Sequence, residues 1–88
     1  MKCCSYRKGY ILKIDYENKL IVIAKDKKDI YTYTRLVYSD KTIIMSKEYK
    51  EIPIEELSEN DYVFVYHSIA VTFSIPPQTY AYIIEVKK

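Results

Sequence analysis

A chain of 88 residues with a net charge of +2 is the size of one domain. Its 49% apolar content and single glycine exclude a flexible low-complexity protein. Fourteen Lys and Arg against twelve Asp and Glu disfavour a strongly basic nucleic-acid binder, and no apolar run is long enough for a membrane-spanning helix.

The composition favours strands over helices. Eleven tyrosines occur together with many isoleucines, valines and threonines, all of which favour pleated sheets. Alanine, the best helix former, occurs only at Ala24, Ala70 and Ala81.

The first half of the chain predicts hairpin-connected strands. Alternation predicts a strand over 9–16, so we expect residues 1–8 to be a flexible N-terminus and 9–88 to be the domain. Residues 20–24, apolar throughout, predict a strand covered on both faces. Residues 31–38, with alternating Tyr and Thr, predict a third strand after a charged turn.

The second half predicts one short helix between strands. Residues 42–46 resume as a strand and are expected to form a hairpin with the third. Pro53 suits the first turn of a short helix or 3₁₀ turn over 53–58. Residues 61–67 and 79–86 predict the fourth and fifth strands.

Two prolines mark where the last strand begins. Pro76 and Pro77 cannot donate ladder hydrogen bonds, so pairing cannot extend back through them. We expect the Gln78 amide to bond the backbone groups that they leave free, so that Gln78→Ala would cost about 1–3 kcal/mol. Ala81 is small enough for the strand to pass close to a neighbour.

This order predicts an all-β fold, namely a five-stranded Greek-key barrel of the oligonucleotide/oligosaccharide-binding (OB) type with a short helix between strands three and four. A small open sandwich or a meander is the alternative.

The back half also resembles a known group. The stretches "IPIEELSENDYVFVYHS" and "SIPPQTYAYIIEV" resemble small OB-like bacterial domains of unknown function with a "DL-x-x-GD" step, a "V-x-V" strand and "S-x-P-x-Q-x-x-A-x-x-I". The matching residues are Glu56, Leu57, Asn60, Asp61, Val63, Val65, Ser74, Pro76, Gln78, Ala81 and Ile84. In front, only "G-x-I" at Gly9 matches, and Asn60 stands where the group has glycine.

The resemblance implies a barrel and no activity. Domains of this group are often found on lipid-anchored or secreted proteins of Gram-positive bacteria. The start "MKCCSYRKG" has no apolar stretch before its cysteines, so the sequence as it stands predicts a cytoplasmic protein. The alternative is a lipid-anchored protein whose leader has been removed, with Cys3 or Cys4 near the mature start.

No catalytic constellation is evident, and we expect neither enzyme activity, a cofactor nor a metal. His67 is the single histidine, without an evident carboxylate to orient it as a general base. Glu55 and Glu56 point in different directions on a helix, and Cys3 and Cys4 are expected to be inert.

Binding is the expected function. The candidate ligand-binding residues are Tyr31, Tyr33, Arg35, Tyr38, Lys27 and Lys28. A tyrosine-rich face with few charges suits a protein partner or a homodimer. The alternative is single-stranded nucleic acid, with bases stacked on Tyr31 and Tyr33 and phosphates bound by Arg35 and the lysines.

Overall fold

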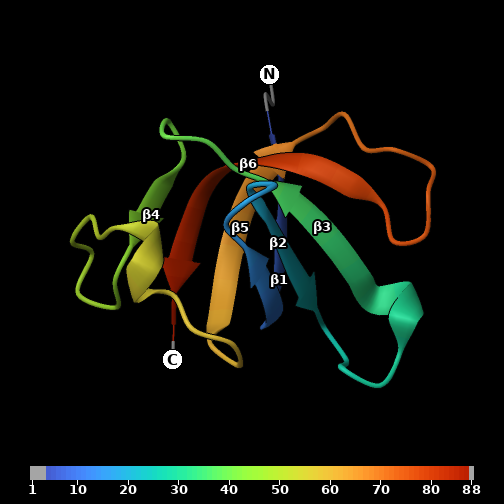
Figure 1. Ribbon diagram of the computed structural model, residues 1–88, viewed down its shortest axis with the longest axis horizontal. Coiled ribbons are helices and arrows are strands. Elements are labelled where there is room, and N and C mark those ends of the chain that lie inside the picture. Colours follow the sequence, from blue (N-terminus) through green and yellow to red (C-terminus); the bar gives the residue numbers. More distant parts are fainter. Residues whose placement is uncertain (1–3, 88) are drawn as a thin grey trace.

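The computed structural model describes residues 4–87, which form six strands and two short 3₁₀ helices (Figure 1). In chain order they are β1 (Cys4–Asp15), β2 (Leu20–Ala24), η1 (Ile30–Thr32), β3 (Tyr33–Val37), β4 (Ile43–Met45), η2 (Ile54–Glu56), β5 (Tyr62–Ser68) and β6 (Gln78–Val86). The predicted all-β class is confirmed.

Five of these strands close into a barrel. β1 pairs with β2 and β5, β2 pairs with β3, and β5 pairs with β6, all antiparallel. β3 then pairs in parallel with β6, with Leu36 opposite Thr79, and this pairing completes the ring. The connectivity is that of an OB-like Greek-key barrel, as the strand order predicted.

β1 pairs with two different strands along its length, and the change of partner occurs at Tyr10. Residues 4–10 pair with β5 and residues 10–15 pair with β2, with a register shift between Ile11 and Lys13. The expected strand start at Gly9 is therefore wrong, and residues 4–8 are not a loose terminus. The charged Arg7 side chain points inward, so residues 4–8 lack the alternation of apolar and polar residues that would have predicted a strand. Residues 1–3 lie outside the part of the chain that the structure describes.

β4 occupies a different place from the one expected. Residues 42–46 do not form a hairpin with the third strand, because β4 adds in parallel to the outer edge of β6, with Ile44 opposite Ile84. The Thr42 hydroxyl donates to the Ala81 carbonyl at 2.8 Å and draws this segment toward β6. Likewise, residues 31 and 32, the first two of the predicted third strand, belong to η1 instead, whose first turn is capped by the Asp29 side chain.

The connection from β4 to β5 closes one end of the barrel. The predicted helical turn is present as η2, and Leu57 directly after it is buried in the core. Asn60 has φ 75°, in the left-handed region that Asn tolerates better than most residues. This geometry explains why an asparagine can stand where the resembled group has glycine.

The barrel interior is mainly apolar. Its core consists of Ile11, Ile21, Ile23, Leu36, Tyr38, Ile44, Leu57, Val63, Val65, Ala81 and Ile84. The buried polar side chains are Thr34, Thr42, His67 and Thr79.

The segment before β6 is held by Thr72 rather than by Gln78. The Gln78 N–H donates to the Thr72 hydroxyl at 2.9 Å, and the Thr72 N–H donates to the Gln78 carbonyl at 3.0 Å. Within residues 4–87 the Gln78 amide side chain makes no hydrogen bond. Pro77 still marks the strand start, and its carbonyl accepts the Arg35 N–H at 2.8 Å.

We therefore expect Gln78→Ala to change the free energy of unfolding by less than about 0.5 kcal/mol. Thr72→Val should cost about 0.5–1.5 kcal/mol, because it removes the hydroxyl that accepts the Gln78 N–H. Urea unfolding followed by tyrosine fluorescence measures both variants. A larger cost for Gln78→Ala than for Thr72→Val would contradict this assignment.

Candidate binding surfaces

Two of the expected ligand-binding residues lie together on the outer face of β3. Successive side chains of a strand point to opposite faces. Thr34 and Leu36 are buried inside the barrel, so Tyr33 and Arg35, which alternate with them, point outward. Arg35 pairs with Val22 on β2. This is the strand 2–3 face on which OB-like barrels bind ligands.

Three more expected residues lie in the connection before β3. Tyr31 belongs to η1 and is 78% exposed. The Tyr33 hydroxyl donates to the Lys27 carbonyl at 2.6 Å, and the Asp26 carboxylate accepts the Lys28 N–H at 2.9 Å. These bonds hold the charged turn beside the end of the β3 face.

Tyr38 does not join this surface. It is only 7% exposed, belongs to the hydrophobic core, and lies on the same side of the chain as Leu36. Burial raises the pKa of its hydroxyl above the ordinary value of 10.0. Because its ring packs inside, Tyr38 is not available for stacking on a ligand.

An aromatic surface that the sequence did not single out covers the outside of β1 and β5. We call it the aromatic–lysine face, and it consists of Tyr6, Lys8, Tyr10, Lys27, Tyr62, Phe64, Tyr66 and Lys87. Neighbouring ring centroids are 4.9 to 5.7 Å apart. The Lys8 ammonium lies 5.8 Å from the Phe64 ring centroid, and that of Lys27 lies 5.1 Å from the Tyr10 centroid.

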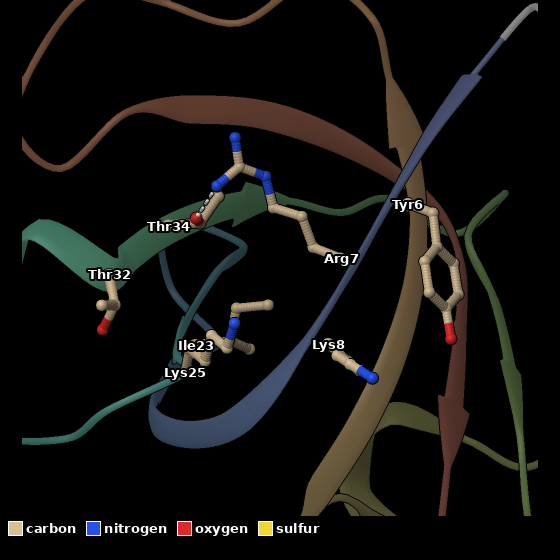
Figure 2. Close-up of a pocket in the computed structure, with 7 residues that line it drawn as sticks. All are labelled: Tyr6, Arg7, Lys8, Ile23, Lys25, Thr32 and Thr34. Atoms are coloured by element: carbon tan, nitrogen blue, oxygen red, sulfur yellow. Dashed lines mark hydrogen bonds between the residues drawn. The ribbon is translucent and has the colours of Figure 1, made fainter.

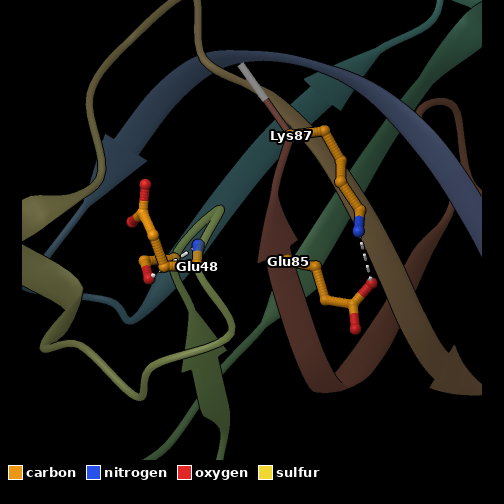
Figure 3. A network of polar contacts seen from close by, with 4 residues as sticks. Glu48, Glu85 and Lys87 are labelled. Carbon is orange, nitrogen blue, oxygen red and sulfur yellow. Dashed lines mark hydrogen bonds and ion pairs between the residues drawn. The ribbon is translucent and has the colours of Figure 1, made fainter.

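Lys87 is anchored at the other edge of this face. Its Nζ is 5.3 Å from the Phe64 centroid and 5.0 Å from the Tyr49 centroid. Figure 3 shows it reaching toward Glu85 on β6, whose Oε1 is 3.4 Å away. Lys87 is thus matched by a carboxylate, which leaves Lys8 and Lys27 as the main positive charges of the face.

The loop between β5 and β6 carries three strongly exposed apolar side chains. Phe73 is fully exposed, and Ile69 and Ile75 are 65% and 64% exposed. The loop extends away from the barrel (Figure 1). Its backbone is nevertheless tied down, since Thr79 donates to the Ser68 and Ala70 carbonyls, both at 2.9 Å.

Arg7 and His67 meet at the polar end of the barrel interior. Arg7 Nη1 donates to the Thr34 hydroxyl at 2.9 Å, and Arg7 Nε donates to His67 Nε2 at 3.3 Å. Since Nε2 accepts, the His67 proton is on Nδ1, which donates to the Ser68 carbonyl at 2.8 Å. Both imidazole nitrogens are therefore occupied, and His67 is placed as a structural residue.

The environment of His67 favours its neutral form. Burial lowers its pKa below the ordinary value of 6.5; the bond to Ser68 raises it, and the Arg7 charge lowers it. Protonation of Nε2 would remove the acceptor of the Arg7 N–H and bring two positive charges together.

We therefore expect stability to depend on pH through His67. With a folded pKa below 6.5, the unfolded chain binds the proton first, so this contribution is complete above about pH 6.5 and is lost as the pH falls toward the folded pKa. Urea unfolding of wild type and His67→Gln at pH 7.5 and 5.5 measures it. The wild type should lose more stability on acidification than the variant, and an equal loss would contradict the neutral assignment.

The acidic residues, histidine and cysteine of residues 4–87 do not gather into a further site. Within residues 4–87 no group of three or more His, Cys, Asp or Glu is placed to hold a metal ion. Glu55 and Glu56 are exposed on η2. Cys4 opens β1 opposite Ser68, whereas Cys3 lies outside the described residues.

None of the helices among residues 4–87 has the length and apolar character needed to cross a membrane. Comparison with protein-family models, curated proteins and solved structures gives no match.

Proposed function

We propose that this chain is a non-enzymatic OB-like binding module that binds a protein partner through the loop between β5 and β6. The observation that carries the proposal is the exposure of Ile69, Phe73 and Ile75 on one short, uncharged loop. Clustered exposed apolar side chains mark interaction sites, because leaving them in water is unfavourable.

The loop is built to present these side chains. The Ser74 hydroxyl donates to the Pro76 carbonyl at 2.9 Å and lies 2.7 Å from the Thr72 hydroxyl. Bonds of this kind fix the loop before binding, so that less conformational entropy is lost in a complex. In OB-like barrels the corresponding loop flanks the ligand-binding face.

Site-specific crosslinking tests this proposal. A photoreactive residue at position 73 should give a discrete protein adduct in cells of the source organism, whereas one at exposed Tyr31 should not. Ile75→Ser combined with the probe at 73 should abolish the adduct. Equal adducts from both positions, or none from position 73, would contradict the proposal.

Related measurements on the same loop distinguish two other ligands, a second copy of this chain and a lipid membrane. An adduct of twice the chain mass, with a sedimentation coefficient that rises with concentration and is lost in Phe73→Ser, would identify a homodimer. Cosedimentation with lipid vesicles that is lost in Phe73→Ser would assign the loop to a membrane surface and overturn a protein partner.

Single-stranded nucleic acid is the second candidate, supported by the lysines interleaved with rings on the aromatic–lysine face. Each exposed aromatic–base stack contributes about 1–3 kcal/mol. A labelled oligothymidine should then bind at low salt, and its affinity should fall steeply as salt is added. Binding by the aromatic–lysine face should be weakened by Phe64→Ala, whereas binding by the β3 face should be weakened by Tyr33→Ala. A lack of binding at low salt would eliminate this candidate.

We further propose that the chain belongs to the bacterial group that it resembles. In support, Val63 and Val65 on β5 and Ala81 and Ile84 on β6 are all buried in the core of the barrel. Membership would favour a lipid-anchored or secreted protein over a cytoplasmic one. The nucleotide sequence upstream of Met1 tests this: an in-frame leader supports it, and a stop codon directly upstream favours the cytoplasm.

A further inference from the structure

A hollow of about 330 Å³ opens at the polar end of the barrel, beside Arg7. Its described lining comprises Tyr6, Arg7, Lys8, Ile23, Lys25, Thr32 and Thr34. No carboxylate belongs to this set. Two other hollows on the described surface, of about 400 and 550 Å³, include aspartates in their linings.

Arg7 is a half-buried cation without a counter-ion. Within residues 4–87 its hydrogen-bond partners are the neutral Thr34 hydroxyl and the neutral His67 ring, and no carboxylate forms an ion pair with it. Withdrawing a guanidinium from water is unfavourable unless an anion compensates it. The position therefore fits a site that an anion completes.

The guanidinium also has donors to spare. Arginine carries five N–H groups, and the bonds to Thr34 and His67 use two of them. Figure 2 shows the Arg7 side chain extending toward Thr34, on the opposite side of β1 from Tyr6 and Lys8. The Thr34 hydroxyl accepts from Arg7 and keeps its own proton to donate.

A second cation lies at the rim. Lys25 is exposed and lines the hollow, whereas the ammonium of Lys8 lies over the Phe64 ring on the outer face. Ile23 supplies an apolar wall. Two cations suit a doubly charged oxyanion, and a hollow of this size also admits an organic group beside it.

We propose that this hollow binds a small molecule carrying a phosphate or sulfate group, with Arg7 and Lys25 as the charged contacts and Thr34 as an added donor. This inference is independent of the loop between β5 and β6. It assigns a ligand class to a hollow whose described lining includes no residue of that loop.

Amide chemical shifts of labelled protein, followed at constant ionic strength, test the proposal. Inorganic phosphate should give saturable shifts confined to Arg7, Lys25 and Thr34, with sodium chloride as the baseline. Sulfate should act similarly and acetate more weakly. Phenyl phosphate should bind more tightly than inorganic phosphate, because its ring can pack against Ile23.

Matched variants complete the test. Arg7→Gln should weaken phosphate binding about tenfold or more, and Lys25→Gln by a smaller factor. Lys13→Gln, an exposed lysine on β1 outside the hollow, should have no effect. If Arg7→Gln does not fold, the proposal is tested by the chemical-shift changes of the wild type and by the phosphate affinity of Lys25→Gln. Shifts spread evenly over surface lysines, no saturation, or unchanged binding in Lys25→Gln would overturn the proposal.

Discussion

Gly9→Ala is expected to lower the free energy of unfolding by about 1–3 kcal/mol, although alanine is otherwise the better residue for a folded chain. A Cβ at this position would lie 2.7 Å from the Ala24 carbonyl oxygen and 2.9 Å from its carbonyl carbon. Both atoms belong to the β2 backbone, so no side-chain rotation can relieve the overlap. β1 or β2 must move, and the β1–β2 ladder begins at this point with Tyr10 opposite Ala24.

Urea unfolding followed by tyrosine fluorescence measures this effect, and Ser5→Ala is the matched control. Ser5 is exposed on the same strand, so its substitution should change stability by less than about 0.5 kcal/mol. Gly9→Val should be worse than Gly9→Ala, because two further methyl groups enter the same space. A Gly9→Ala protein as stable as wild type would show that β1 and β2 do not approach this closely.

Ile84→Ala is expected to cost about 2–5 kcal/mol, the range for deleting a fully buried isoleucine. Ile84 is 0% exposed and lies on β6 opposite Val65 on β5 and Ile44 on β4. Truncation would leave a cavity in the middle of the barrel core.

Ile83→Ala is the control that tests the register of β6. Ile83 is the neighbouring residue with the same side chain, but it lies on the outer face and is only half-buried. We expect it to cost less than half as much as Ile84→Ala, by thermal or urea unfolding. Since a one-residue slip exchanges the two faces of a strand, a reversed order would show that the register is wrong.

The sequence was sufficient to predict those strands whose positions depend on local residue patterns. β2 has the predicted bounds because an apolar run between polar turns has few alternatives. β5 begins and ends one residue later than predicted, and β6 begins one residue earlier. β4 was misplaced because its partner is β6, about forty residues away, and a parallel pairing leaves no local signal. The start of β1 was missed because Arg7 is an inward-facing cation, which the alternation rule reads as surface.

The candidate binding residues were likewise predictable where they depend on local pattern and not where they depend on contacts between distant segments. Tyr33 and Arg35 share the predicted face, but Tyr38 differs from them in parity along the chain, and the two-residue period already separates it from Tyr33. The alternating Tyr62, Phe64 and Tyr66 signalled half of the aromatic–lysine face. The half contributed by β1 required its pairing with β5, which only the fold supplies. The hollow at Arg7 depends on four segments meeting and has no sequence signature.

The central claim is that the sheet closes by parallel pairing of β3 with β6, and nuclear Overhauser effects across that seam test it most directly. The structure predicts backbone contacts between Leu36 and Thr79 and between Val37 and Tyr80, with slow exchange of the Arg35 amide that donates to Pro77. Absence of these contacts, together with antiparallel contacts between β3 and residues 42–46, would contradict the closed barrel and support an open meander.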